Sequence, residues 1–250
     1  MDGIRLRRAD GILRITLHRP EKRNALTGAM YGAFADALEL ADAADDVRVV
    51  VVDATGSHFS AGNDIGEFVG GTYDLSPGTP WRRFTDGLHG VHKPVVAGVQ
   101  GYAVGIGLTM LLHFDLVYVD ETARLSAPFG RLGLVPEVAS SALLPLRIGI
   151  LNANALFYLG KVLSASDAVR LGIANEVVAS GLAAQSAMDA ARVVAALPRL
   201  SVEQTRVLVR APFVSAADRV RSECEAFMRC IGSKDTRTIL ESLAAKRAGS

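Results

Sequence analysis

The stretch "VRVVVVDATGSHFSAGND" (residues 47–64) joins the most strand-like run of the chain to a turn of small residues. The four consecutive valines at 49–52 predict a strand that is buried on both faces, as in a parallel sheet. The turn at 58–64 contains Gly62, and small residues let another group approach the backbone closely. The stretch therefore indicates a buried strand followed by a tight turn, but it leaves the purpose of that turn open.

A second stretch, "KPVVAGVQGYAVGIGLTMLL" (residues 93–112), repeats this order. Residues 95–112 carry no charge and are about as long as a membrane span. A single helix would be interrupted repeatedly here, because helix-breaking residues recur at Pro94, Gly98, Gly101, Gly105 and Gly107. We therefore expect a buried strand, a glycine turn at 101–107 and a buried helix, and no membrane span.

The rest of the chain predicts an α/β body followed by helices. The expected elements are a hairpin of strands 4–8 and 12–18, helices 27–44 and 80–92, strands in "DLVYVD" and "ARLSAP", and amphipathic helices near 182–196, 201–211, 215–231 and 235–247. After Val138 the pattern is mostly helical. We divide the chain into a core of residues 1–195 and a helical C-terminal region of residues 196–250.

Composition favours a globular protein without a nucleic-acid or membrane partner. The 250 residues are 50% hydrophobic and carry a formal net charge of +1, so no basic footprint for nucleic acid or lipid is present. Cys224 and Cys230 alone imply neither a disulfide framework nor a metal site. Neither end of the sequence reads as a signal peptide or a peroxisomal address. These features predict a cytoplasmic protein, and the abundance of Arg and Ala suggests a bacterial source.

The two turns, 58–64 and 101–107, share a chemical possibility. Backbone N–H groups at a strand-to-helix turn lack a ladder partner, and two such groups that converge would stabilise negative charge on a carbonyl oxygen. Taken alone, each turn is more often a packing feature. The glycines of the second turn run G-x-x-x-G-x-G, which is not the dinucleotide order G-x-G-x-x-G, and the chain has no G-x-x-x-x-G-K-[ST] phosphate loop.

Several motifs together resemble the crotonase (enoyl-CoA hydratase/isomerase) superfamily. They are the "LHRPEKRNAL" loop, "HFSAGNDI" and "KPVVAGVQGYAVGIGLTMLLHFDLVYVDETARLSAPFGRLGLVPE", and the likeness covers nearly the whole chain. The resemblance implies an α/β spiral of repeated ββα units with a helical trimerisation region. In that family the two turns each donate one backbone N–H to the thioester oxygen of an acyl-CoA. The matching donors here are Asn63 and Ile106.

The resemblance also implies the substrate contacts and the assembly. The positions that would contact the acyl-CoA are Lys22, Arg23, Ala25, Ala61, Asp64, Ile65, Gly105 and Phe129. No metal or redox cofactor is implied, because the CoA is part of the substrate. The resemblance further implies a homotrimer or a dimer of trimers, with the tail from about Ser201 onward supplying part of the contact surface.

The acidic residues bear on the reaction. The hydratases that the chain resembles use two glutamates to manage water, and the matching positions here hold Thr109 and Phe129. Glu137 is the only acid between Glu121 and Asp167, and its apolar surroundings tend to raise a carboxyl pKa. In the peroxisomal-type Δ3,Δ2-enoyl-CoA isomerases, which the "PFGRLGLVPEVASS" segment also resembles, the matching Pro-Glu supplies the base. The sequence therefore favours double-bond isomerisation with Glu137 as the base.

Other interpretations stay open at this level. Pro136–Glu137 is also a normal way to begin a helix, and both roles are compatible. The alternative functions are an enoyl-CoA hydratase or another crotonase-type lyase or hydrolase, and a catalytically silent acyl-CoA-binding homologue. His113 in "HFD" is interpreted as structural, and no G-x-S-x-G elbow indicates a serine hydrolase. Three aromatic residues would either line an acyl pocket or pack a loop: Phe68, Trp81 and Phe84.

Overall fold

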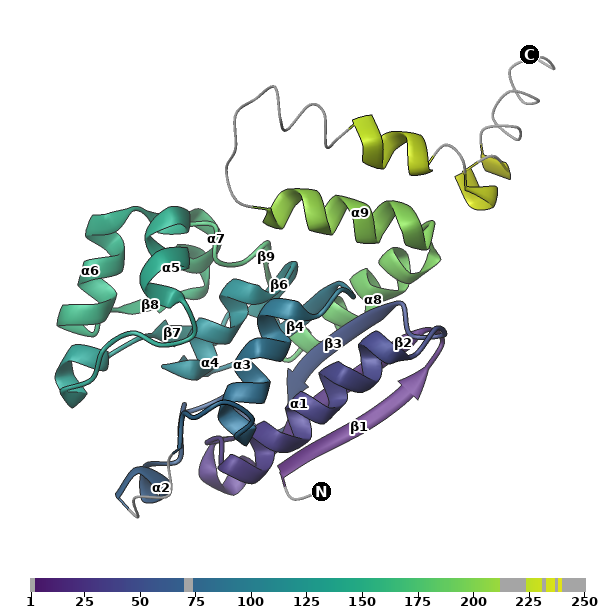
Figure 1. Cartoon of the computed structure of the whole chain (residues 1–250). Helices are drawn as coiled ribbons and strands as arrows, with labels where there is room; N and C mark the ends of the chain where they lie inside the picture. Colours follow the sequence, from purple (N-terminus) through teal and green to yellow (C-terminus); the bar gives the residue numbers. More distant parts are fainter. Residues whose placement is uncertain (1–2, 70–73, 212–223, 231–232, 237, 240–250) are drawn as a thin grey trace. The chain divides into compact units, whose positions relative to one another are not determined.

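The computed structural model describes residues 3–69, 74–211, 224–230, 233–236 and 238–239 (Figure 1). The chain divides into two compact units, residues 1–192 and residues 193–250.

The first unit alternates strands and helices. In chain order its strands are β1 (Gly3–Ala9), β2 (Ile12–His18), β3 (Val49–Ala54), β4 (Val95–Val99), β5 (Tyr102–Val104), β6 (Leu116–Asp120), β7 (Arg124–Ser126), β8 (Val162–Ser164) and β9 (Glu176–Val178). Its α-helices are α1 (Gly28–Ala43), α2 (Ile65–Val69), α3 (Pro80–Gly90), α4 (Ile106–Thr109), α5 (Ser140–Ile148), α6 (Ile150–Leu159), α7 (Ala165–Arg170) and the start of α8 (Ala183–Ala196). Three short 3-10 helices complete it: η1 (Pro20–Lys22), η2 (Met110–His113) and η3 (Phe129–Leu132). The predicted α/β class is confirmed.

The larger sheet has six strands in the order β1-β2-β3-β4-β6-β9. The β1–β2 hairpin is antiparallel, and the other pairings are parallel. The valines at 49–52 are fully buried, so β3 is covered on both faces as its sequence predicted. The carboxyl ends of β3 and β4 lie at the same edge of this sheet, and the two glycine-containing turns begin there.

The smaller sheet has three strands in the order β5-β7-β8. The pairs β4–β5 and β6–β7 each place one strand in the larger sheet and the next in the smaller one. An isolated parallel bridge between Ser60 and Ala103 joins the first turn to β5. This repeated exchange between two sheets matches the spiral of ββα units that the family resemblance implied.

Three local features were not predicted. The region after Val138 contains β8 and β9 in addition to helices, and β5 was also not expected. Each of these strands has three residues, which is too short for alternation to appear in the sequence. The buried helix expected after the second glycine turn is divided into α4 and η2. Among the described residues no helix is long and apolar enough to cross a membrane.

The amino terminus of α1 has the predicted cap. The Thr27 hydroxyl accepts a hydrogen bond from the Met30 backbone N–H at 3.3 Å, which satisfies one of the free donors of the first turn. The alanine-rich helix packs closely on α3, where the ring centroids of Phe34 and Phe84 lie 5.0 Å apart. This packing places Tyr31 in the core, on the same helix and close to the first turn.

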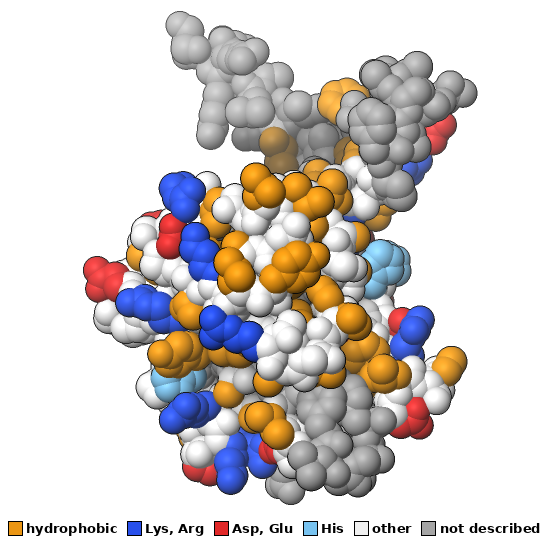
Figure 2. Space-filling model, turned by 90° about the vertical axis from the view of Figure 1, so that its left-hand side faces the viewer, with side chains coloured by type: hydrophobic (Ala, Val, Ile, Leu, Met, Phe, Trp, Pro, Cys, Tyr) orange, Lys and Arg blue, Asp and Glu red, His pale blue; other side chains and the backbone are white. Residues whose placement is uncertain are grey.

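One face of the first unit carries a cluster of exposed apolar side chains. Figure 2 looks onto the side that carries α5 and α6, and hydrophobic side chains gather there. The exposed apolar residues of α5, α6 and β8 are Leu146, Ile150, Leu151, Tyr158, Leu159 and Val162. Apolar clusters of this kind commonly mark contact surfaces.

The second unit contains the end of α8 and all of α9 (Arg199–Arg210). Two further helices were predicted at 215–231 and 235–247. Residues 224–230 are helical, whereas residues 212–223 and 240–250 lie outside the described part of the chain. The structure therefore tests these two predictions only in part.

Candidate active site

The two turns lie directly against each other. The Ser60 backbone N–H donates to the Tyr102 carbonyl at 2.9 Å, and the Val104 N–H donates to the Ser60 carbonyl at 3.0 Å. A Cβ atom on Gly62 would stand 3.0 Å from the Val104 carbonyl oxygen, and one on Gly107 would stand 3.0 Å from Ser60. Glycine at these two positions is what allows the backbones to approach so closely.

The hydrogen bonds around Asn63 determine where its own amide points. In the bridge to the 19–26 loop, the Leu26 N–H donates to the Gly62 carbonyl and the Asp64 N–H donates to the Leu26 carbonyl, at 2.8 and 2.9 Å. Because this parallel bridge uses the groups that flank Asn63, the Asn63 N–H is directed away from Leu26. Ile106 is the first residue of α4, where backbone N–H groups point out of the helix end.

Asn24, which the sequence analysis did not single out, ties the 19–26 loop to the first turn. Its side-chain amide donates to the backbone carbonyls of Thr55 and His58 at 2.9 and 2.8 Å. Its own backbone carbonyl accepts from the Ser60 hydroxyl at 2.9 Å. Asn24 is fully buried and has a φ of 54°, a left-handed conformation that asparagine tolerates better than most residues. Its position inside "RPEKRNAL" was the available signal.

Arg19 adds a charged link to the same turn. Its guanidinium contacts the Asp64 carboxylate at 2.5 Å and also donates to the Ala25 carbonyl at 3.1 Å. The hydrogen bond from Arg19 lowers the pKa of Asp64 below its ordinary value. The sequence analysis named Asp64 and Ala25 but missed Arg19, which connects them.

The other predicted CoA contacts form one exposed edge. Lys22 and Arg23 are exposed in the 19–26 loop, and Ile65 is exposed at the start of α2. The Ala61 N–H donates to the Arg23 carbonyl at 2.9 Å, so the loop and the first turn are held together here. Two exposed cations beside a backbone turn can bind a phosphorylated ligand.

Glu137 lies next to the first turn, although it is 74 residues away in sequence. The Asn63 side-chain amide donates to its Oε2 at 3.5 Å. Its other oxygen, Oε1, is buried and has no hydrogen-bond partner among the described residues. Burial raises the pKa of the Glu137 carboxyl from 4.5 to about 7, and the hydrogen bond from Asn63 acts in the opposite direction. A carboxyl with this pKa is suited to accept and return a proton near neutral pH.

Tyr31 supports this contact from the core. Its hydroxyl donates to the Asn63 side-chain oxygen, which leaves the amide nitrogen of Asn63 directed at Glu137. The Tyr31 ring lies 5.0 Å from the Phe84 ring, so the phenol is held by packing. The sequence pattern of α1 marked Tyr31 only as part of a helix.

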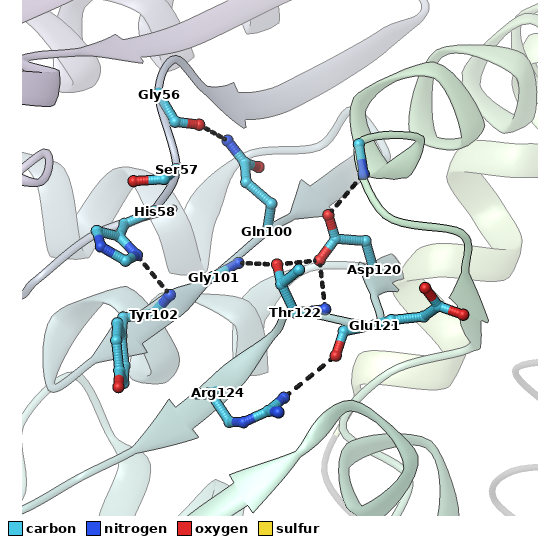
Figure 3. Close-up of a pocket in the computed structure, with 11 residues that line it drawn as sticks. Gly56, Ser57, His58, Gln100, Gly101, Tyr102, Asp120, Glu121, Thr122 and Arg124 are labelled. Carbon is cyan, nitrogen blue, oxygen red and sulfur yellow. Dashed lines mark hydrogen bonds between the residues drawn. The ribbon is translucent and has the colours of Figure 1, made fainter.

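A separate cavity of about 650 Å³ lies at the carboxyl ends of β3, β4 and β6 (Figure 3). His58 Nδ1 accepts from the Tyr102 N–H at 3.3 Å, and Asp120 accepts from Thr122 and Gly181. Burial lowers the pKa of His58 and the charge of Arg23 lowers it further, which favours the neutral, accepting imidazole. Glu137 does not line this cavity. The polar groups that line it form hydrogen bonds with residues where the two turns begin.

Comparison with known proteins identifies the family. The sequence model described as enoyl-CoA hydratase/isomerase matches residues 7–248. The chain belongs to this family. A solved structure from Magnetospirillum magneticum AMB-1, named as an enoyl-CoA hydratase/carnithine racemase, superposes with a TM-score of 0.94 at 35% identity. The superposition covers 98% of this chain and 97% of the other.

Curated relatives carry the names of more than one reaction. Enoyl-CoA delta isomerase 2 of Rattus norvegicus is 33% identical over 213 residues, covering 83% of this chain and 54% of that protein. Enoyl-CoA hydratase AFT3-1 of Alternaria alternata is 35% identical, covering 80% of this chain and 69% of that protein. The chain spans about half the length of the delta isomerases it matches.

Within this enoyl-CoA hydratase/isomerase fold, the two positions assigned to hydratase glutamates are buried. Thr109 ends α4 and is fully buried, and its hydroxyl has no hydrogen-bond partner among the described residues. Phe129 begins η3, with its ring centroid 6.1 Å from that of Phe157. Gly105 precedes α4 with a φ of 53°. Neither Thr109 nor Phe129 provides a carboxylate beside the turns.

The three aromatic candidates have different surroundings. Phe84 is fully buried against Tyr31 and Phe34, so it packs α3 on α1. Trp81 is partly buried against the same core. The side chain of Phe68 lies outside the described residues. Packing is therefore the role of Phe84, and the alternative of an acyl-pocket lining stays open for the other two.

Proposed function

We propose that this protein is a Δ3,Δ2-enoyl-CoA isomerase, which converts a 3-enoyl-CoA to the 2-trans-enoyl-CoA. The observation that carries the proposal is the environment of Glu137. This carboxyl touches the first turn through Asn63 and has a pKa of about 7. Thr109 and Phe129 stand where the resemblance places the hydratase glutamates. One base with a pKa near neutral is what a double-bond shift requires.

In this proposal the backbone amides of Asn63 and Ile106 bind the thioester oxygen. The contact between the two turns and the direction of the Asn63 amide support this assignment. Each such donor contributes roughly 3 kcal/mol to stabilising the charge that develops on the oxygen. Glycine at 62 and 107 supports this assignment, because a Cβ atom at either position would stand 3.0 Å from the other turn.

The reaction then needs two proton transfers. The C2 protons of a 3-enoyl-CoA are acidic because the thioester and the alkene flank them. Glu137 removes one of these protons through its unpartnered Oε1, which leaves a dienolate with its oxygen on the two amides. The protonated Glu137 then delivers the proton to C4, where the C3=C4 electron pair forms the new C–H bond. The C1=C2 pair of the dienolate becomes the C2=C3 double bond, and the thioester carbonyl re-forms. This route uses no metal or redox cofactor.

The CoA portion is assigned to the edge formed by the 19–26 loop and the first turn. Lys22 and Arg23 would meet the phosphates, and the backbone around Ala25 and Ala61 would meet the adenine. The ion pair between Arg19 and Asp64 holds this edge together.

The experiment is turnover of 3-hexenoyl-CoA, followed by the absorbance of the conjugated product, in wild type and Glu137→Gln. Loss of the only base should lower kcat about 10²- to 10⁴-fold while acyl-CoA binding persists, because Gln keeps the shape but accepts no proton. Glu176→Gln, which changes an exposed carboxylate on β9, is the matched control and should behave like wild type.

Other outcomes would identify the alternatives. Near-normal turnover by Glu137→Gln would show that the base lies elsewhere. Hydration of a 2-enoyl-CoA by wild type at rates comparable to isomerisation would identify a hydratase. Tight binding of acyl-CoA without turnover of either substrate would identify a silent homologue.

A further inference from the structure

His113 makes a buried contact with the residue that follows Glu137. It ends η2, is 5% exposed, and its Nε2 lies 3.0 Å from the Val138 carbonyl oxygen. A carbonyl oxygen only accepts hydrogen bonds, so Nε2 carries the proton and donates it. The sequence indicated no more than a structural role for this histidine.

The bond acts on a strained piece of backbone. Val138 and Ala139 have φ values of 52° and 54°, in the left-handed region that side chains other than glycine rarely occupy. For a β-branched residue such as Val138 this conformation is particularly unfavourable, and it persists only where the surroundings hold it. Rotation about the Val138 backbone would swing Glu137 relative to α5.

Two kinds of contact hold this turn. Its own segment closes through the Ser140 N–H, which donates to the Glu137 carbonyl, and the Leu143 N–H, which donates to the Ala139 carbonyl, both at 2.9 Å. His113 adds a hydrogen bond from a different element. This hydrogen bond links the turn to a segment outside its own.

The helical segment that ends at His113 begins at Ile106, the proposed oxyanion donor. Helix α4 starts at Ile106 and continues without a gap into η2, which ends at His113. All eight residues of this segment are buried. A short, buried helical segment therefore connects the amide of Ile106 to the carbonyl next to Glu137.

We propose that His113 is a positioning residue, which holds the Glu137–Ala139 turn in place. The Glu137 carboxylate then stays beside Asn63 and keeps a fixed position relative to the Ile106 amide. This inference rests on the proposed function, since it assigns Glu137 as the base. His113 itself contacts the backbone of Val138 and takes no proton from the substrate. Its contribution should therefore appear in kcat and leave acyl-CoA binding unchanged.

The test compares His113→Gln with His113→Asn. Both are neutral amides, but the Gln nitrogen stands where His Nε2 stands, whereas the Asn nitrogen falls one bond short of Val138. We expect the Asn variant to lose about 10- to 100-fold in kcat with KM within about twofold of wild type, because displacing a base by about 1 Å has an effect of this size. The Gln variant should stay within about threefold of wild type in both constants.

Crystal structures of the two variants provide a readout that does not depend on activity. The Asn variant should show residues 133–139 rearranged and Glu137 withdrawn from Asn63, and the Gln variant should superpose on wild type. Equal kcat values in the two variants with Glu137 unmoved in both would overturn the positioning role. If wild type fails to isomerise 3-hexenoyl-CoA, the proposed function fails, and the two structures still decide whether His113 positions the turn.

Discussion

Replacing Glu137 with Gln should stabilise the protein at alkaline pH while it removes activity. The folded protein raises the pKa of this carboxyl from 4.5 to about 7, because burial disfavours the charged form. Each pKa unit is worth about 1.4 kcal/mol, so holding the ionised carboxylate in the folded state costs roughly 3 kcal/mol. Gln is neutral at every pH and resembles the protonated acid in shape.

The direction of this pH dependence follows from the number of protons that the folded and the unfolded protein each bind. Between pH 4.5 and about 7 the folded protein keeps a proton on Glu137 that the unfolded chain has released. The free energy of unfolding therefore falls as pH rises through this window. The stability that comes from keeping the proton on Glu137 is fully lost above about pH 7. Glu137→Gln should match wild type near pH 4.5 and exceed its stability by up to roughly 3 kcal/mol at pH 8.

The assay is denaturant unfolding of wild type, Glu137→Gln and the exposed control Glu176→Gln at both pH values and one protein concentration. The control should show no comparable gain at pH 8, because its carboxylate is exposed on β9. An equal difference between wild type and Glu137→Gln at the two pH values would refute the reasoning, since the buried charge would then have no energetic cost.

Two further predictions test the site and the assembly. In wild type, kcat/KM for isomerisation should rise with pH and level off above an inflection near 7, because only ionised Glu137 accepts the C2 proton; a profile that is flat from pH 5 to 8 would exclude this carboxyl as the base. Light scattering should show a trimer or a dimer of trimers, since the resemblance implies one and the α5–α6 face exposes Leu151 and Tyr158; a monomer at micromolar concentration would reject it.

Much of the fold could be predicted because its signals are local. The run of valines in β3 and the Thr27 cap of α1 can each be recognised from a few consecutive residues. Such signals set where a strand, helix or turn begins. The strands β5, β8 and β9 were missed because their existence depends on pairing with distant segments.

The candidate site divides in the same way. The sequence alone determined the family resemblance, the two turns and the absence of glutamate at 109 and 129, since these are properties of residue type and order. Only the tertiary structure brought Glu137 to Asn63, placed Tyr31 behind that contact and set His113 against Val138. The apolar neighbours of Glu137 in sequence predicted that its pKa would be raised, but the size of the shift depends on burial, which only the folded chain determines because it excludes solvent from the carboxyl.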